Sequence, residues 1–210
     1  MSDYTFPFDT CERPNKTGIA QPYSVFVNLI TCSIVLFFLL KTKNNHSFFL
    51  LFSLLVFEII HTFSHLIHIK GHFLVTITHI AGFLVNISFL NFLYNYTHIL
   101  PKLYYLFFLG CILLLDAYSF FNLSFIYFVL TQIFLFVAIL YYYYPVLPKQ
   151  IKSKIQLILL ITGLVYLGFV NEKVNCKTML NMFPKFPFHA IIETLSIIPI
   201  YLFSHTFYNL

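Results

Sequence analysis

The segment Glu58-Ile-Ile-His-Thr-Phe-Ser-His-Leu-Ile-His68 places ionisable side chains inside a stretch that is otherwise apolar enough to cross a membrane. On a helix with about 100° per residue, its five polar side chains fall within roughly one third of the circumference. Ionisable groups in hydrocarbon cost on the order of 2.5–3.5 kcal/mol each, so they are kept mainly where they face a cavity, a metal or a proton path. The segment therefore predicts a membrane helix with one polar face, made of Glu58, His61, Ser64, His65 and His68.

The composition of the chain is that of a membrane protein. Of its 210 residues, 60% are hydrophobic and only 9% are charged, which excludes an ordinary soluble domain and a disordered chain. The net charge of +5 is scattered, without the basic stripe that a nucleic-acid partner requires. The first 20 residues lack a basic start followed by an apolar run, so we expect no cleavable signal peptide.

Apolar runs of about 20 residues, the length that crosses a bilayer, recur along the whole chain. The connections between them are only a few residues long, so consecutive helices must be antiparallel neighbours. We expect an all-α fold, a single seven-helix membrane domain over residues 1–210, whose residues 1–21 form a short extramembrane segment. The predicted spans are 23–40, 47–69, 73–95, 101–121, 124–144, 151–170 and 187–207.

Seven spans place the two termini on opposite sides of the membrane. The twelve Lys and Arg residues divide evenly between the two sides, so the positive-inside rule does not set the orientation. Asn15-Lys-Thr17 is a glycosylation sequon, and Cys11 and Cys176 would share the amino-terminal side, where a disulfide can form if that side is oxidising. We therefore expect a lumenal or extracellular amino terminus, in an endomembrane (ER or Golgi) or in the plasma membrane.

The alternation of the spans brings four distant side chains to one membrane depth, namely His68, His79, His189 and Glu193. His189 and Glu193 are also one helical turn apart on the same face. Two histidines and a carboxylate form a ligand set that zinc accepts while keeping a fourth position for water. A nearby His or Glu can take and return the proton of that water, which is the chemistry of amide or ester hydrolysis.

Three short motifs are spread over nearly the whole chain. They are Asp9-Thr-Cys-Glu-Arg13 followed by Gly18-Ile-Ala-Gln-Pro22 and Asn28, then Ser64-x-x-x-His68, and finally Phe188-His-Ala-Ile-Ile-Glu193. At these motifs the chain resembles the alkaline ceramidase family, part of a superfamily of seven-helix membrane hydrolases that includes the adiponectin-receptor-like proteins. The resemblance implies a zinc amidase that cleaves a ceramide-like membrane lipid into a sphingoid base and a fatty acid.

The resemblance also implies roles for the residues that match the motifs. Ser64 would assist at the oxyanion, and His68 and His189 would bind zinc. Glu193 stands where the family has a second histidine, and His79 stands where its catalytic Asp is expected. Either Glu193 is the third zinc ligand and His79 the proton shuttle, or His79 is the ligand and Glu193 the base.

The amino-terminal motif carries two further implications. Cys11 would pair with Cys176 in a disulfide. Asp9 and Glu12 match acidic residues that bind calcium in the family. Gln21 stands where the family usually has Glu, and losing a carboxylate should reduce calcium affinity.

The remaining polar residues of the spans have simpler interpretations. We expect His61 and His65 to line the cavity, with a second metal or a proton relay as the less favoured role. Glu58 should hydrogen-bond to a neighbouring helix, and Asp116 should be a buried partner between helices.

Two other functions fit the sequence less well. A ceramidase-like protein that lost catalysis would bind lipid as a receptor-type seven-helix protein. An ion or proton carrier is disfavoured, because the ionisable groups gather at one side of the membrane instead of crossing it. No protein partner is inferred.

Overall fold

The computed structural model describes residues 5–6, 14–15, 17–67, 69–70, 73–97, 101–122, 125–184 and 186–210. These residues confirm the predicted all-α fold and form seven α-helices, one 3-10 turn and one pair of very short strands. The helices are α1 (Pro22–Lys41), α2 (Asn45–Leu66), α3 (Phe73–Thr97), α4 (Lys102–Asn122), α5 (Phe125–Tyr143), α6 (Lys149–Met182) and α7 (Phe188–Phe207).

The start of α1 and the link to α2 follow from local sequence. Pro22 occupies the first turn of α1, where the missing N–H costs no hydrogen bond. After Thr42, the side chain of Asn44 caps α2 by accepting a hydrogen bond of 2.8 Å from the backbone N–H of His46. A link this short forces α1 and α2 to run antiparallel.

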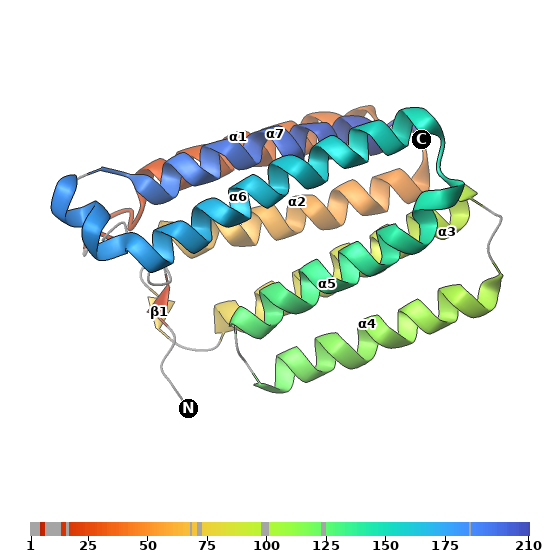
Figure 1. The fold of residues 1–210 in the computed structure, drawn as a ribbon, viewed down its shortest axis with the longest axis horizontal. Coiled ribbons are helices and arrows are strands. Elements are labelled where there is room, and N and C mark those ends of the chain that lie inside the picture. The colour runs from red at the N-terminus through yellow and green to blue at the C-terminus, as the bar shows by residue number, and fades with distance from the viewer. Residues whose placement is uncertain are drawn as a thin grey trace.

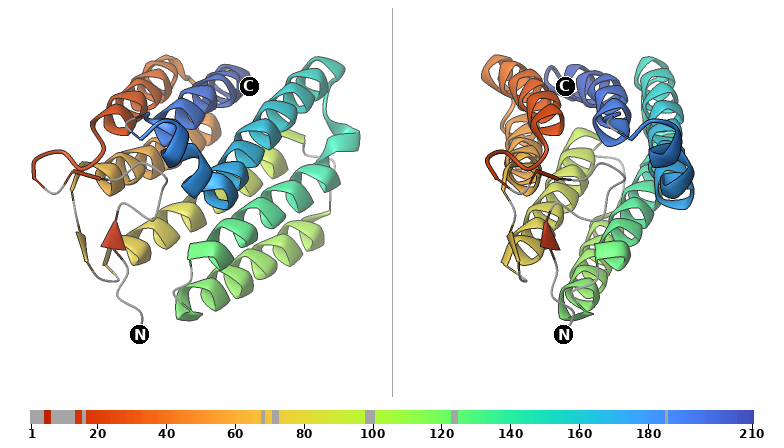
Figure 2. Two further views of the ribbon diagram at one scale, coloured as in Figure 1. Left: turned by 60° about the vertical axis from the view of Figure 1, so that its left-hand side comes forward. Right: turned by 90° about the vertical axis from the view of Figure 1, so that its left-hand side faces the viewer.

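Helix α3 joins two groups of helices (Figures 1 and 2). On one side, α1 packs against both α2 and α7, and α7 packs against α6. On the other side, α4 and α5 pack against α3 and against each other. Helices α1 and α7, far apart in sequence, are therefore neighbours, and the polar face of α2 can meet residues of α7.

The two short strands connect the amino-terminal segment to the end of α2. Strand β1 (Thr5–Phe6) pairs antiparallel with β2 (Ile69–Lys70), with Thr5 opposite Lys70. The backbone N–H of Gln21 also donates to the carbonyl of His65, at 3.0 Å. The sequence did not predict this pairing, which holds the amino-terminal segment at the polar end of α2.

Five helices of the described part are long and apolar enough to cross a membrane: α1, α2, α3, α7 and the Lys149–Glu172 part of α6. Their outer faces expose large apolar side chains, such as Leu40 at 78% and Phe26 at 64%, as expected of surfaces that contact lipid. The chain is thus an integral membrane protein by this criterion. The count of seven spans stays a prediction. Among the described residues, the end of α5 and the 3-10 turn after it form only a shorter apolar segment, Leu130–Val146.

The predicted sixth span, residues 151–170, agrees with the Lys149–Glu172 part of α6 that is apolar enough to cross a membrane. Helix α6 itself continues to Met182 and has 34 residues. It extends past the apolar run because Asn171–Met182 contains no Gly or Pro and its polar residues are compatible with a helix. The extension brings Glu172 into the bundle, where it is buried.

The interior of the bundle is divided along its length. A large apolar cluster at the end where α3 and α7 finish includes Phe89, Phe92 and Phe207. The buried ionisable residues of α2 and α7 lie near the end of α2 and the start of α7. An open apolar groove of about 440 Å³ runs along α1 against Tyr201 of α7, and no Asp, Glu, His, Lys or Arg lines it.

Asp116 is a buried partner between helices, as predicted. Its Oδ1 accepts a hydrogen bond of 2.6 Å from Nε2 of Gln132 on α5. Gln132 in turn accepts a hydrogen bond from Asn86 of α3. These three polar side chains join α3, α4 and α5 inside an otherwise apolar region.

The contact between α6 and α7 leads to a stability prediction. A Cβ added at Gly168 would meet Cγ2 of Ile192 at 3.1 Å, whereas one added at Gly163 would meet nothing within 4 Å. We expect Gly168→Val to destabilise the protein by about 1–3 kcal/mol, because the added methyl groups overpack this contact. Gly163→Val is the matched control, and unfolding in detergent measures both variants. Equal losses at the two glycines would contradict the tight α6–α7 packing.

Candidate metal centre

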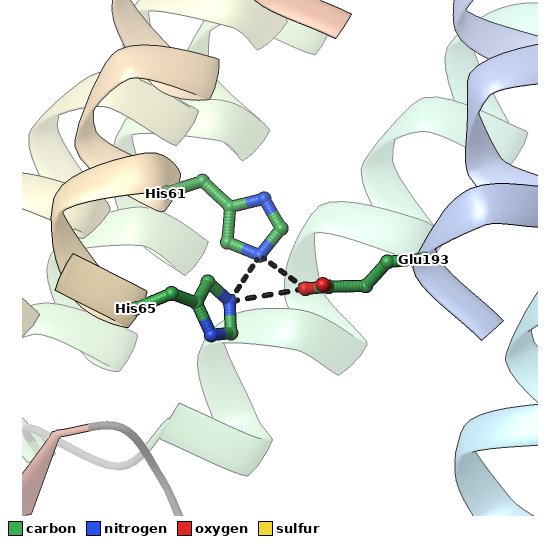
Figure 3. Close-up of side chains that lie close together, drawn as sticks. All are labelled: His61, His65 and Glu193. Atoms are coloured by element: carbon green, nitrogen blue, oxygen red, sulfur yellow. Dashed lines mark hydrogen bonds and ion pairs between the residues drawn. The ribbon is translucent and has the colours of Figure 1, made fainter. Parts of the chain in front are cut away.

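Side chains from α2 and α7 converge at the polar end of the bundle (Figure 3). His61 and His65 are one turn apart on α2, and His189 and Glu193 are one turn apart on α7. Oε1 of Glu193 lies 3.0 Å from Nε2 of His65, 3.2 Å from Nε2 of His189 and 3.6 Å from Nε2 of His61. The Nε2 atoms of His61 and His65 are 3.2 Å apart. One carboxylate oxygen thus lies among three imidazole nitrogens.

The carboxylate at this centre is among the most deeply buried polar groups described. Glu193 is 1% exposed, and neither of its oxygens has a hydrogen bond of acceptable geometry from another described residue. A buried charge without partners costs several kcal/mol, on the order of the penalty for an uncompensated ion. The arrangement therefore calls for a cation beside Glu193.

Two of the imidazoles are held by side chains of other helices. Nδ1 of His65 lies 2.5 Å from Oε1 of Gln21, and Nδ1 of His189 lies 2.9 Å from Oε2 of Glu172. Because both partners are oxygen acceptors, each Nδ1 donates the proton and each Nε2 turns its lone pair toward Glu193. Metal-binding histidines are oriented in this way, by a carboxylate or carbonyl that accepts from the outer nitrogen.

The third imidazole has a looser contact of the same kind. Nδ1 of His61 lies 3.8 Å from Oε2 of Glu58. Glu58 also accepts a hydrogen bond of 3.1 Å from Oγ1 of Thr31 on α1, which confirms its predicted bond to a neighbouring helix. The side chain of His61 is 37% exposed, so the centre is most open on the side of this residue.

The spacing of the donors fits a zinc ion. Ligands at about 2.0–2.1 Å in a tetrahedron lie about 3.3 Å from one another. His61, His65 and Glu193 offer one ligand atom each within this range of spacing. Nε2 of His189 lies 3.2 Å from Oε1 of Glu193. A single metal ion held by His61, His65 and Glu193 would account for the short contacts among these three side chains. The residues present therefore fit a metal ion.

The structure brings some of the site residues predicted from sequence together and does not describe others. It brings His189 and Glu193 together, as the spacing predicted, but His68 lies outside the described residues and its zinc role stays a prediction. Ser64 is buried, and its hydroxyl donates to the backbone carbonyl of His61 at 2.6 Å. His79 is buried, donates from Nδ1 to the carbonyl of Val75 at 2.7 Å and packs against a ring of α4.

The imidazoles within 4.0 Å of Glu193, among the described residues, are those of His61, His65 and His189. His61 and His65 were expected to line the cavity, and they lie 3.6 Å and 3.0 Å from Oε1 of the carboxylate. Their i,i+4 spacing, the same as that of His189 and Glu193, was the signal that could have identified them. Glu172 was missed because it lies beyond the predicted end of the sixth span.

The expected calcium and disulfide positions are mostly outside the described part. Asp9, Glu12 and Cys11 have no described placement, so the calcium site and the disulfide with Cys176 stay predictions. Cys176 lies on the part of α6 that follows Glu172.

Comparison with protein-family models and with curated proteins finds no match for this chain. The three motifs that resemble alkaline ceramidases are therefore supported by their own residues alone. The argument for a function depends on the geometry of the centre.

The centre predicts how substitutions change metal content. We expect the purified protein to hold one zinc per chain, and His65→Ala and Glu193→Gln to lose it, because each removes a donor. Gln21→Leu should weaken zinc binding about 10–100-fold, since it removes only the acceptor that orients His65. Elemental analysis after dialysis against a graded chelator measures each effect.

His205→Ala is the matched control, because His205 lies on the same helix at the opposite end of the bundle. It should leave the zinc content unchanged. A wild-type chain without zinc, or variants that all retain it, would contradict the assignment.

Proposed function

We propose that the protein is a zinc-dependent hydrolase within the membrane that cleaves the amide bond of a ceramide-like lipid. The products are a sphingoid base and a fatty acid. The observation that supports this most is the convergence of His61, His65 and Glu193, with both oxygens of the buried carboxylate lacking hydrogen bonds. The position of these groups among apolar helices suits a substrate that enters from lipid.

A zinc ion bound here would acidify a water molecule and polarise the substrate carbonyl. His61, His65 and Glu193 would hold the ion, which leaves a position for water. Gln21 fixes the orientation of His65 by accepting from its Nδ1. Burial of Glu193 at 1% exposure keeps bulk water away from the ligands.

In this proposal His189 is the general base and acid. Its Nε2 is near the ligand oxygen of Glu193, and its Nδ1–H donates to Glu172, a carboxylate that stabilises the imidazolium form. Nε2 takes a proton from the attacking water, the water oxygen joins the acyl carbon, and the carbon–nitrogen bond breaks. The proton then passes to the leaving nitrogen, so the amine and the carboxylic acid balance the water consumed.

The lipid specificity comes from the resemblance to alkaline ceramidases at the three motifs. The roles that the resemblance implies for Ser64 at the oxyanion and for His79 as proton shuttle stay predictions, and His189 takes the proton transfer in this proposal. The proposed location is an endomembrane or the plasma membrane, with the amino terminus lumenal or extracellular and Cys11 paired with Cys176.

A second function is favoured by one distance. His189 Nε2 is 3.2 Å from Oε1 of Glu193, close enough to be a fourth ligand. Four protein ligands close a zinc site, and closed sites are structural. The protein would then bind lipid without turnover, as a catalytically inactive relative of the ceramidases.

His189→Ala distinguishes the two functions. In a hydrolase, the variant keeps its zinc and loses about 10²–10⁴-fold in rate, because the proton acceptor is gone. In a closed structural site, the variant loses zinc affinity and there is no turnover to lose. Release of sphingoid base from a panel of ceramides, measured by mass spectrometry alongside zinc content, reads both properties.

His205→Ala should behave as wild type in both measurements. Zinc-loaded wild-type protein that releases no base from any ceramide would contradict the hydrolase proposal. Wild-type activity that is retained in His189→Ala would remove His189 from proton transfer.

A further inference from the structure

One face of α1 carries three buried polar side chains that the proposed chemistry leaves without a role, and Gln21 at the N-cap of α1 adds a fourth buried polar side chain. On a helix at about 100° per residue the three on α1 fall within roughly 60° of one another. Each is at most 1% exposed. The four residues are Gln21, Ser24, Asn28 and Thr31.

Two contacts fix this face against the polar face of α2. Gln21 meets His65 through a backbone hydrogen bond and a side-chain contact, and Thr31 donates to Glu58. The face of α1 between these two contacts must therefore lie toward the stretch of α2 that contains His61.

The antiparallel direction of the two helices sets the level of Asn28. Asn28 precedes Thr31 by three residues, and His61 follows Glu58 by three residues, which is about 4.5 Å along each axis in the same direction. Counted from the Thr31–Glu58 contact, Asn28 lies level with His61, and counted from the Gln21–His65 contact it lies level with Glu58, so it lies between the levels of these two residues. His61 is the ligand on the open side of the centre.

The polar atoms of Asn28 are buried and unpaired. Neither Nδ2 nor Oδ1 has a hydrogen-bond partner among the described residues, and the same is true of Oγ of Ser24. Leaving a buried donor or acceptor unsatisfied costs about 1–3 kcal/mol. These atoms belong to the face of α1 that lies against the polar face of α2, where a polar ligand would satisfy them.

The chemistry of the asparagine side chain identifies the ligand group. A carboxamide offers a donor on Nδ2 and an acceptor on Oδ1, so it can donate to the C=O of an amide or accept from its N–H. The hydroxyl of Ser64, the other candidate donor, already donates to the carbonyl of His61. Asn28 is thus the neutral donor left available beside the centre.

We propose that Asn28 binds the amide group of the lipid substrate at the metal centre, with Nδ2 donating to the amide oxygen. This inference rests on the proposed function for the identity of the substrate. It assigns α1 as the wall that selects an amide over an ether or a simple hydrocarbon. Ser24, one turn away on the same face, extends this polar wall toward the end of α2.

The test compares two fluorescent lipids that differ only in the linkage, an amide and an ether. Equilibrium binding to the purified full-length protein in micelles is measured at low temperature, with product analysis to verify that the amide is intact. We expect the wild type to bind the amide about tenfold more tightly, the size of effect that a hydrogen bond to a buried group gives. Asn28→Leu should bind both lipids equally and keep its zinc.

Controls separate this effect from a general loss of structure. Ser204→Ala removes another buried, unpaired polar group, at the far end of α7, and should keep the amide preference. Asn28→Ala, which cannot overpack the site, replaces the Leu variant if that one does not fold. A wild type without amide preference, or an Asn28 variant that retains it, overturns the inference.

The two proposals fail in different ways. The zinc-loaded wild type could prefer the amide but never hydrolyse it, and the Asn28 variants could lose that preference. This result would support the binding role of Asn28 and refute the hydrolase. Hydrolysis with an amide preference that is independent of Asn28 would refute the binding role alone.

Discussion

The structure depends on the placement of one carboxylate, that of Glu193, inside a bundle of apolar helices. A charged group in this environment requires a compensating cation, because desolvation of an ion costs several kcal/mol after relaxation. Three imidazoles from α2 and α7 surround it, and none forms an acceptable hydrogen bond with it. A metal ion satisfies the carboxylate and the imidazole lone pairs at once, which is why the site is interpreted as a metal centre.

The same cluster connects four helices. The N-cap of α1 contributes Gln21, α2 contributes His61 and His65, α6 contributes Glu172, and α7 supplies the carboxylate itself. A metal ion bound here would couple its binding to the packing of these helices, as in other proteins whose sites form only on folding. The end of the bundle where α3 and α7 finish is packed mainly by apolar side chains such as Phe89, Phe92 and Phe207.

The sequence predicted the fold well because the spans are long apolar runs with short polar links. The apolar run marks the sixth span but not the end of α6, where helical residues continue past it, and so Glu172 was not recognised. In the site, the His189 and Glu193 pair was found from its one-turn spacing. The involvement of His61 and His65 was underestimated, because the motif match favoured His68. Whether a pair on α2 faces a pair on α7 also depends on the rotation of each helix about its axis, which the sequence does not give.

The central claim is a metal ion bound by imidazole and carboxylate ligands inside the bundle. X-ray absorption at the zinc edge, on the detergent-purified full-length chain, tests it most directly. The account predicts one zinc per chain with only nitrogen and oxygen ligands, and with the multiple-scattering pattern of at least two imidazoles. A protein that binds no zinc, or a zinc ion with sulfur ligands, would contradict it.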